Sequence, residues 1–581
     1  MRLRSPDVVF YHPPAIYDFR ERPEFFGPIS DVIPSSPIFE MYPVGLTTVA
    51  DHLESNGYDV QLINLAHEML RDVEYDAERE IETCPADVVG IDLHWLPHAQ
   101  GATEVAKLVK KHHPDVPVVF GGLAASYYDE ELVTYPWVDY VVRGDSTRDP
   151  MLRLVDALAG DGDLADVPNL TYRRGNETVV NPLQYVPDSL DYAPTPSYSY
   201  VIRSVMKYGS IQKVVPYRGW LEDPVTMLLT VHGCTFDCSF CGGSASAYRD
   251  CFGRDEPAYR SPEILIEDIR QITSFSAGPI FVVGDVRMAG QAYTDRLFDL
   301  LAGTDVENTV IFELFSPADA DFFERADAAL DSYSIELSIE SASQAIRRRV
   351  GKFGVPNEVI ESTIRDAVEN GCEAVDLFFM IGLPEQTTED VMATVEYIDD
   401  LMDRFAGENL KPFIAPLAPF LDPGSPAFEN PEAYGYTLFC ESFEDHRQAM
   451  LSPTWKGMLN YETDWMSRDE IVEVTYEAAR RFNEIKFDHG RIDRETFETV
   501  RDRIERSREI MAELADIEDL PPAERGEKLR DLHERYEEFG EYSICGESEL
   551  SWSNTGLRDV PQLVRVGLSL AADSLRRRLR G

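Results

Sequence analysis

Three cysteines lie close together in the chain, at Cys234, Cys238 and Cys241, in a run that ends with two glycines. Gaps of three and two residues bring their thiolates to one side of a tight loop. There they can hold three irons of a 4Fe–4S cube and leave the fourth iron open to a non-protein ligand. A closed structural zinc site needs a fourth Cys or His at short spacing, and the next cysteine, Cys251, stands apart. The alternative is a chance group of buried thiols, but the spacing predicts an iron–sulfur site.

This loop resembles the signature of the radical S-adenosylmethionine (SAM) enzymes, which is C-x3-C-x2-C with an aromatic residue before the last cysteine, here Phe240. The resemblance implies that Cys234, Cys238 and Cys241 are metal ligands and, through the cluster, catalytic residues, with Phe240 beside the cofactor. It also implies that the amino and carboxylate groups of SAM chelate the open iron. One electron from the cluster then cleaves the sulfonium and yields a 5′-deoxyadenosyl radical.

Apolar patterns predict the elements that position this loop. Val225–Val231 is expected to be a buried parallel strand that delivers the cysteines at its carboxyl end. Five further β-type runs alternate with helical patterns, which predicts βα units and a parallel sheet. These runs are Pro279–Val283, Thr309–Leu314, Tyr333–Ile339, Ala374–Ile381 and Pro412–Leu417. Six repeats suit the partial (β/α)6 barrel of the radical SAM family, in which reactive groups sit at the carboxyl ends of strands.

Residues at three of these strand ends resemble the SAM-binding segments of the family. The resemblance places SAM contacts at Gly284, Asp285, Ser338, Glu340, Ser341 and Gly382. The first two match a Gly-Gly-Glu segment that accepts hydrogen bonds from the substrate's ammonium. The next three match positions that hold the ribose hydroxyls and the methionyl carboxylate, and the last begins a run that packs the adenine. Taken singly, each would be a turn glycine or a core-edge residue, but three matches in order favour the functional interpretation.

The N-terminal third has a second pattern of alternating strands and helices. Helical patterns near Gly45–Asn56, Ala102–Lys111 and Pro150–Leu158 separate most of the strands. This alternation predicts a doubly wound open sheet, whose ligand crevice lies beyond the carboxyl ends of its strands. The expected strands are Val8–Tyr11, Val60–Ile63, Val88–Leu93, Val118–Phe120 and Val138–Val142.

Segments around Asp92 and around the pair Gly121-Gly122 resemble the cobalamin-binding domain that often precedes a radical SAM barrel. The resemblance implies that Asp92, Gly121 and Gly122 line the slot for the nucleotide tail of cobalamin. Two departures stand against it: the Asp-x-His-x-x-Gly loop with a cobalt-ligating His is missing, and Asp92 replaces a small Ser. Radical methylases often lack that His, and some domains of this lineage bind no cobalamin. We interpret His94 and His98 as polar surface or interface residues rather than cobalt ligands.

Composition and motifs divide the chain into four parts. We expect a cobalamin-binding-like domain over 1–165, a hairpin and connecting segment over 166–222, the radical SAM barrel over 223–430 and a mainly helical region over 431–581. The last segment, Leu557–Gly581, has six Arg against two Asp and an apolar content that a helix could gather on one side. Such a helix suits contact with an anionic membrane surface, or docking on the acidic surface of this protein or a second copy.

The chain of 581 residues has a net charge of −50, with 10 Lys against 44 Arg. An acidic, lysine-poor surface of this kind resembles that of proteins from salt-in halophiles, and it argues against binding of nucleic acid. No run of about 20 apolar residues exists and no signal peptide is evident. An oxygen-sensitive cluster and unpaired thiols predict a reducing cytoplasm.

We therefore expect a cytoplasmic radical SAM enzyme with an N-terminal cobalamin-binding-like domain. The leading reaction is methylation of an unactivated carbon, in which the radical abstracts hydrogen and methylcobalamin delivers the methyl group. The alternatives are cobalamin-independent radical carbon–carbon coupling or ring formation, on a lipid or another small molecule, and a corrinoid or SAM sensor without turnover. An electron donor such as ferredoxin or flavodoxin is the expected partner. Substrate and oligomeric state stay open.

Overall fold

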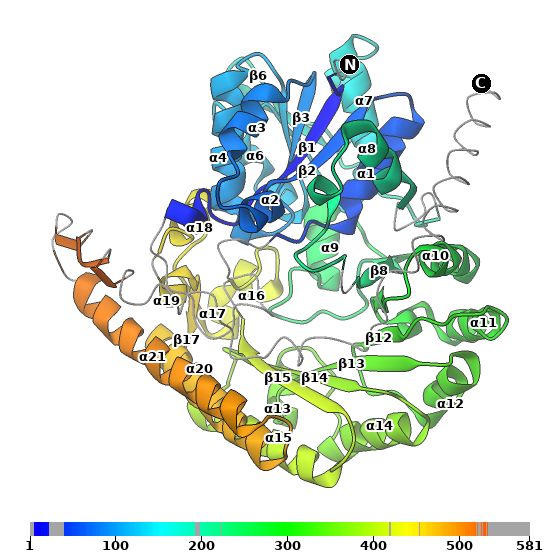
Figure 1. The fold of residues 1–581 in the computed structure, drawn as a ribbon, viewed down its shortest axis with the longest axis vertical. Helices are drawn as coiled ribbons and strands as arrows, with labels where there is room; N and C mark the ends of the chain where they lie inside the picture. The colour runs from blue at the N-terminus through cyan, green and yellow to red at the C-terminus, as the bar shows by residue number, and fades with distance from the viewer. Residues whose placement is uncertain are drawn as a thin grey trace.

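The computed structural model describes residues 5–21, 40–191, 198–221, 224–417, 420–452 and 454–518, together with 520, 524–525, 527–529 and 531–532. Two mainly parallel sheets dominate the fold. Figure 1 shows the N-terminal sheet above the second one, with the C-terminal helices α20 and α21 along one side. The basic segment Leu557–Gly581 and Cys545 lie outside the described residues.

The N-terminal sheet has seven strands in the order β2-β1-β3-β4-β5-β6-β7. The first five are parallel, and the placement of β1 between β2 and β3 is the reversal of strand order expected of a doubly wound sheet. The prediction of an open parallel sheet is confirmed. The strands are β1 (Val8–His12), β2 (Val60–Asn64), β3 (Val88–Asp92), β4 (Val118–Gly121), β5 (Tyr140–Val142), β6 (Leu170–Arg174) and β7 (Glu177–Val180).

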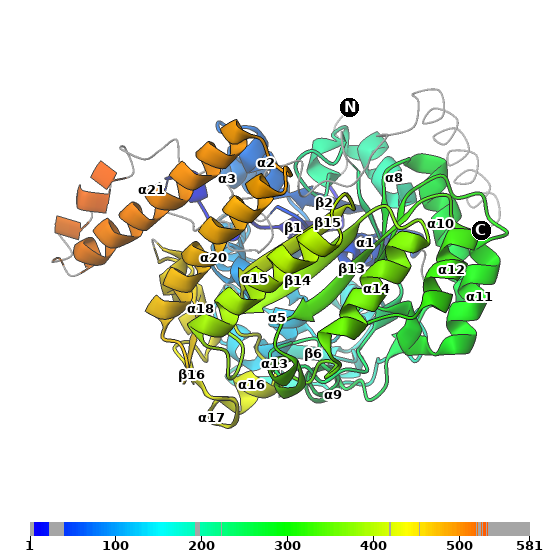
Figure 2. The same ribbon diagram turned by 90° about the horizontal axis from the view of Figure 1, so that it is seen from below.

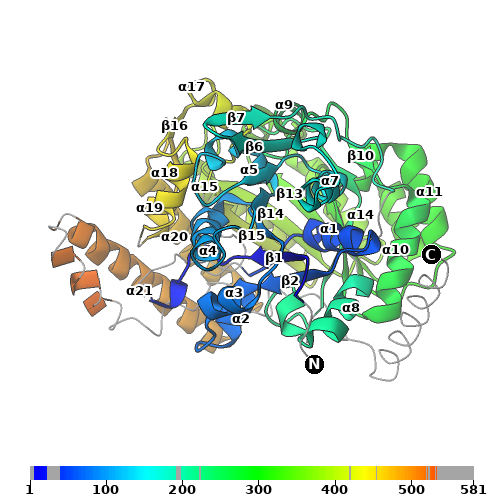
Figure 3. The ribbon, with the colours of Figure 1, turned by 90° about the horizontal axis from the view of Figure 1, so that it is seen from above.

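Helices cover both faces of this sheet, because its strands are apolar on both sides. On one face α3 (Ala77–Thr83) and α4 (Ala99–His112) bury their apolar side chains. On the other, α1 (Val44–Ser55) and α7 (Arg148–Ala159) form a second core, joined by Tyr200 from α8 (Tyr198–Tyr208). Figure 3, seen from above, shows α4 and α1 on opposite sides of β1 and β2.

The predicted hairpin is present as β6 and β7, and it extends the N-terminal sheet. Strand β6 pairs antiparallel with β5, and β7 pairs antiparallel with β6. The turn at Gly175 has φ 65°, a conformation that favours glycine and suits a tight hairpin turn.

The second sheet has six parallel strands in chain order, β8-β11-β12-β13-β14-β15, as the partial (β/α)6 barrel predicts. The helices between them lie outside the strands, as Figure 2 shows from below. The strands are β8 (Thr226–Leu229), β11 (Ile280–Val283), β12 (Val310–Leu314), β13 (Tyr333–Glu340), β14 (Val375–Ile381) and β15 (Leu410–Pro416). The helices are α10 (Pro262–Phe275), α11 (Gln291–Leu301), α12 (Ala320–Ala329), α14 (Asn357–Glu369) and α15 (Thr388–Arg404).

Alternation along the barrel strands separates an apolar outer face from a mixed inner face. On β13, Ile335, Leu337 and Ile339 are fully buried in the core shared with the helices. Glu336 and Ser338 alternate with them and keep some exposure to water. The register places Glu313 of β12 opposite Glu336 of β13. The inner face therefore brings polar side chains from neighbouring strands together.

The C-terminal region packs on the barrel and on the N-terminal domain. Helix α20 (Arg468–Asp488) begins with a capping box of Ser467 and Glu470 and lies against α15 and α21 (Arg494–Glu518). Trp455 and Tyr461 are 3% and 0% exposed, so the aromatic stretch around them forms a packed cap. Within the described part of the chain, no helix is long and apolar enough to cross a membrane.

Candidate active site

The three cysteines lie in the loop that follows β8 and the short β9 (Val231–His232), at the carboxyl end of the first barrel strand. None of them is in a disulfide. Two of the sulfurs already accept backbone hydrogen bonds: the Phe236 N–H donates to Cys234 Sγ at 3.3 Å and the Gly243 N–H to Cys241 Sγ at 3.3 Å. Hydrogen bonds of this kind stabilise thiolate ligands and tune the potential of an iron–sulfur cluster.

The electrostatics of the cysteine loop also fit a cluster. Burial raises the pKa of all three thiols, that of Cys238 to about 11, so they ionise at neutral pH only when a metal replaces the proton. Among the described residues, no three His, Cys, Asp or Glu side chains are arranged to hold a single metal ion. A 4Fe–4S cube would place each of the three cysteines at a separate iron.

A buried ion pair lies beside the cysteines at the end of β13. Glu340 is 4% exposed, and its carboxylate lies 3.0 Å from Lys352 Nζ. Burial alone would lower the pKa of Lys352, but the Glu340 carboxylate and the Cys238 thiol raise it. Glu340 has φ 70°, next to an irregularity in the strand pairing between Ser338 and Glu340. A non-glycine residue held in this region carries strain, which is typical of functional positions.

The other predicted SAM contacts of strands β13 and β14 lie on the same rim. Ser341 is completely buried and accepts a hydrogen bond from the Ser343 N–H, and Ser338 is partly exposed. Gly382 has φ 92°, and a Cβ atom there would lie 2.6 Å from the Tyr461 hydroxyl. Only glycine therefore fits this position.

After β11, the polar groups of Gly284 and Asp285, which the resemblance assigns to SAM binding, make hydrogen bonds within the protein. The Asp285 carboxylate contacts Arg287 at 2.6 Å and accepts the Phe315 N–H at 2.9 Å, so its oxygens are engaged within the protein. The Gly284 N–H donates instead to the Glu313 carboxylate at 2.6 Å. Gly284 has φ 90°, and a Cβ there would meet the Val231 side chain at 2.4 Å.

Two carboxyl groups of this site were missed by sequence analysis. Burial raises the pKa of Glu313 on β12 to about 7, and a glutamate inside the apolar run Thr309–Leu314 was the signal for it. Asp422, in the loop after β15, accepts the Gly242 N–H at 3.0 Å, next to Cys241. The Asp422 side chain is exposed to solvent on one side, and desolvation by the surrounding protein atoms raises its pKa to about 6. No motif indicated Asp422, because its partner lies far away in the chain.

At the N-terminal sheet, Asp92 joins two histidines. Its Oδ2 atom lies 2.8 Å from His12 Nδ1 and 3.0 Å from His94 Nδ1. Burial alone would raise the pKa of Asp92, but His94 and His12 lower it. Of the two alternatives expected for His94 and His98, surface or interface, the structure favours the interface: the His94 side chain is 12% exposed and lines the cavity described below, and His98 is completely buried. His98 is enclosed because its turn packs against α18 (Phe443–Ala449).

The glycine pair after β4 has two different surroundings. Gly122 has φ 117°, and a Cβ there would lie 2.5 Å from the His94 backbone, so the chain itself requires glycine. Beside Gly121 the nearest atom to such a Cβ is the Val142 carbonyl oxygen at 3.8 Å, which leaves space on that side.

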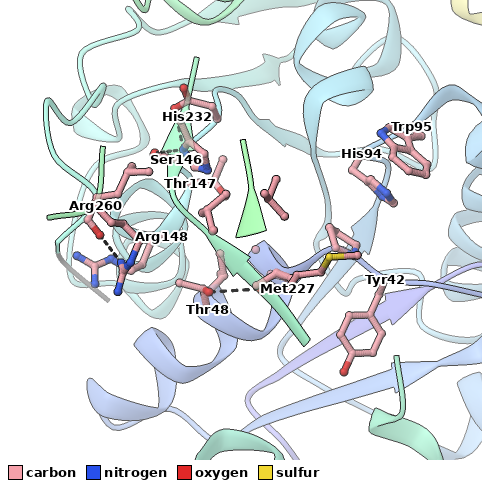
Figure 4. Close-up of a pocket in the computed structure, with 18 of the residues that line it drawn as sticks. Tyr42, Thr48, His94, Trp95, Ser146, Thr147, Arg148, Met227, His232 and Arg260 are labelled. Atoms are coloured by element: carbon pink, nitrogen blue, oxygen red, sulfur yellow. Dashed lines mark hydrogen bonds and ion pairs between the residues drawn. The ribbon is translucent and has the colours of Figure 1, made fainter. Parts of the chain in front are cut away.

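A cavity of about 350 Å³ lies between the two sheets. The N-terminal domain supplies Tyr42, His94 and Trp95, and the barrel supplies Met227 and Val283, among other residues. Figure 4 shows His94 and Trp95 on one side of it and His232, Ser146 and Arg260 on the other. Of the residues expected to line a cobalamin slot, Asp92, Gly121 and Gly122 do not line this cavity; their role stays a prediction.

Comparison with known families finds two matching domain models. The B12 binding domain model matches residues 32–150, and the radical SAM superfamily model matches residues 228–398. The chain belongs to the radical SAM superfamily. Its two matched domains indicate a 4Fe–4S cluster, SAM and cobalamin as cofactors of this radical SAM enzyme.

Relatives of this radical SAM enzyme cover different shares of the chain. An uncharacterised methyltransferase of Pyrococcus horikoshii is 26% identical over 367 residues, 62% of this chain and 73% of that protein. Hopanoid C-3 methylase of Methylococcus capsulatus is 30% identical over 249 residues, 42% of each. The structure of TsrM of Kitasatospora setae, a radical SAM methyltransferase with cobalamin and a 4Fe–4S cluster bound, has 16% identity, a TM-score of 0.55 and coverage of 76% of this chain and 84% of TsrM. This likeness confirms the fold.

Contacts between the two domains of this radical SAM enzyme converge on the loop after β5. Asp145 forms an ion pair with Arg254, which follows the cysteine loop, and both side chains are nearly inaccessible, at 3% and 2% exposure. The Ser146 hydroxyl lies 3.2 Å from Nδ1 of His232, two residues before Cys234. Asp145 and Ser146, which line the cavity, are thus joined directly to residues on both sides of the cysteine loop.

Proposed function

We propose that this enzyme transfers a methyl group to an unactivated carbon atom of a small molecule. The observation that carries the proposal is the cavity between the sheets, which is lined by the N-terminal domain, by barrel strands β8 and β11, and by His232 at the base of the cysteine loop. A corrinoid in that cavity would lie between the crevice of its own domain and the barrel rim. When bound, the cluster supplies the electron that cleaves SAM, and cobalamin supplies the methyl group.

The residues of the chain divide this work between the two domains. Cys234, Cys238 and Cys241 hold the cluster, and Gly242 after them is tied to the Asp422 carboxylate. The pair of Glu340 and Lys352 sets the charge of the rim where SAM would bind. The packed cap meets the barrel rim at Gly382, where the Tyr461 side chain lies against it. Exclusion of water from a radical site protects a carbon radical from side reactions.

The names of the relatives agree with methyl transfer. The Pyrococcus horikoshii protein is described as a methyltransferase and the Methylococcus capsulatus protein as a hopanoid methylase. Because the second is matched over 42% of its length, its substrate is not carried over to this chain. Methyl transfer is the common element, and the substrate is open.

The proposal is tested by a bulky substitution that fills the cavity but lies outside the barrel. Thr48 on α1 lines the cavity, whereas Thr83 on α3 is exposed on the surface. We expect Thr48→Trp to lose bound cobalamin, measured from the absorption spectrum after anaerobic reconstitution and gel filtration, and to keep forming 5′-deoxyadenosine from SAM. The control Thr83→Trp should bind cobalamin like the wild type. Stoichiometric cobalamin in Thr48→Trp, or none in the wild type, would contradict the proposal.

Methyl transfer itself needs a second measurement. Metabolites and lipids of a deletion strain are compared by mass with those of the wild type, and the missing product should be heavier than its precursor by one methylene unit. A product that differs by a new ring or a new carbon–carbon bond would instead indicate radical coupling without methyl transfer.

A further inference from the structure

The ring of His94 is held in one orientation at the wall of the cavity. His94 comes two residues after the end of β3, and its Nδ1 atom lies 3.0 Å from Oδ2 of Asp92, the last residue of that strand. His12, at the end of the neighbouring strand β1, contacts the same oxygen atom through its own Nδ1 at 2.8 Å. Asp92 is 5% exposed and His12 is completely buried. The carboxylate is therefore fixed from behind and in turn fixes the His94 ring.

This contact decides which nitrogen atom of His94 is left for a ligand. Burial would raise the pKa of Asp92, but His94 and His12 lower it, so its carboxylate is ionised and can only accept hydrogen bonds. Nδ1 of His94 is then the donor, and in the neutral ring Nε2 carries the lone pair. Among the residues that the structure describes, none is a hydrogen-bond partner of this Nε2. The side chain is 12% exposed and lines the cavity, where Figure 4 shows it beside Trp95.

A carboxylate behind one ring nitrogen and an available lone pair on the other are what a metal-binding histidine needs. Across the described ranges, no group of three His, Cys, Asp or Glu side chains could hold a bare metal ion. A metal at Nε2 must therefore bring most of its ligands with it. A corrinoid meets this condition, because its ring surrounds the cobalt with nitrogen atoms and leaves the axial positions to other ligands.

We propose that Nε2 of His94 binds the cobalt of the corrinoid, with Asp92 as the positioning residue that orients the imidazole. The inference rests on the proposed function, because it needs a corrinoid in the cavity. The opposite axial position, on which cobalamin carries its methyl group, then faces Met227 and Val283 of the barrel. This assignment replaces our interpretation of His94 from the sequence, which did not show that the Asp92 carboxylate is buried behind the ring.

The test uses the full chain, reconstituted anaerobically with its cluster and with cobalamin. The cobalt is brought to the cobalt(II) state with the cluster oxidised, so that electron paramagnetic resonance detects the cobalt alone. An axial nitrogen ligand splits this signal into triplets for ordinary nitrogen and into doublets for ¹⁵N. The nucleotide base of cobalamin also contains nitrogen, so the protein is prepared with ordinary and with ¹⁵N-labelled histidine. If His94 is the ligand, the triplets become doublets in the labelled protein.

Two variants show which histidine is responsible. His94→Gln keeps a polar side chain but removes the imidazole, so we expect it to bind cobalamin and to lose the doublets. Its iron content after reconstitution should equal that of the wild type, which reports an intact fold. His112→Gln is the matched control, because His112 lies at the other end of α4 and pairs with Glu78 at 2.7 Å. This control should keep the doublets.

The possible results separate the inference from the proposed function. Triplets that persist in the labelled wild type would assign the axial ligand to the nucleotide base, and a signal without nitrogen splitting would mean that no imidazole is bound. Doublets that persist in His94→Gln would assign another histidine. Each of these results overturns the inference while bound cobalamin still supports the proposed function. A wild type that binds no cobalamin overturns both.

Discussion

The two sheets of this enzyme differ in how the residues at the carboxyl ends of their strands are held in place. Both are mainly parallel, and both offer the carboxyl ends of their strands to a cofactor. In the barrel, the strand ends carry short sequence runs whose glycines and acids are placed by the local backbone, as Gly382 and Glu340 show. In the N-terminal sheet, polar side chains at the strand ends satisfy one another, as His12, Asp92 and His94 do.

This difference explains why short sequence motifs identify the barrel site but not the N-terminal crevice. A radical site needs fixed residue types at fixed places, so its parts can be found along the chain. The N-terminal crevice is shaped by residues such as Tyr42 and Trp95, which no short pattern connects. Its chemistry is supplied by the cofactor itself, and the protein contributes shape and orientation.

The largest effect should come from the cysteine loop, where the barrel's motif is tested directly. We expect Cys234→Ala, Cys238→Ala or Cys241→Ala to abolish formation of 5′-deoxyadenosine from SAM under dithionite, because each thiolate holds one iron of the cube. Cys251→Ala is the control and should leave the iron content unchanged. The assignment fails if the triple Ala variant still produces 5′-deoxyadenosine.

The second prediction tests whether the ion pair between Asp145 and Arg254 holds the N-terminal domain and the barrel together. Arg254→Ala leaves the buried Asp145 carboxylate without its partner, and breaking a buried pair in this way costs about 3–5 kcal/mol of the free energy of unfolding. Arg153→Ala removes a far more exposed pair with Asp149 on α7 and should cost at most about 1 kcal/mol. Denaturant unfolding of the two variants measures the difference, and equal losses would mean that the domains are joined elsewhere.

A smaller effect concerns the barrel rim alone. Glu340→Ala should weaken SAM binding about tenfold to hundredfold, since a charged hydrogen bond is worth about 1.5–3 kcal/mol. Iron content should stay at the wild-type level, as should SAM affinity in the exposed control Glu324→Ala. Equilibrium dialysis with SAM gives the affinities. Unchanged binding in Glu340→Ala would assign the contact to another carboxylate.

The smallest expected effect lies where the cap meets the N-terminal domain. His446 Nδ1 donates to the Ser442 carbonyl, and Nε2 accepts from the Asn460 amide at 3.0 Å, so the neutral ring is satisfied. Burial lowers the pKa of His446 to about 4. A lowered histidine pKa gives stability that is complete above about pH 6.5 and is lost as the pH falls toward 4.

Between pH 7 and pH 5 this group should therefore cost the wild type about 2 kcal/mol of the free energy of unfolding. His446→Gln carries no titratable ring and should lack this part of the pH dependence. Urea unfolding of both proteins at the two pH values measures the difference. A parallel loss in both would assign the acid sensitivity to other groups.

Sequence predicted most of the barrel, because apolar runs and helical periods repeat six times there. It predicted the first five strands of the N-terminal sheet and the hairpin, but not that β6 pairs with β5, since pairing between distant strands leaves no local pattern. The cysteine run and the strand-end segments were found by type and spacing. Their roles as ligands, and the halophilic and cytoplasmic setting, stay predictions.

The rest of the site depends on contacts between distant residues. Asp422 meets Gly242, and Glu313 meets Gly284, only after the strands are aligned. The sequence left open whether His98 lies at the surface or at an interface, because a histidine in a loop gives no sign that α18, more than three hundred positions later, packs over it. Such residues are visible only when the whole chain is folded.

The order of the two sheets along the chain has a consequence for how the protein is made. Every strand of the N-terminal sheet ends by Val180, before any residue of the cysteine triad. Ribosomes add about 5–20 residues per second, and domains generally fold as units from the N-terminus. The wall that carries Asp145 can therefore form while the cysteine loop is still being synthesised. The cysteine loop would then emerge beside an N-terminal sheet that is already folded.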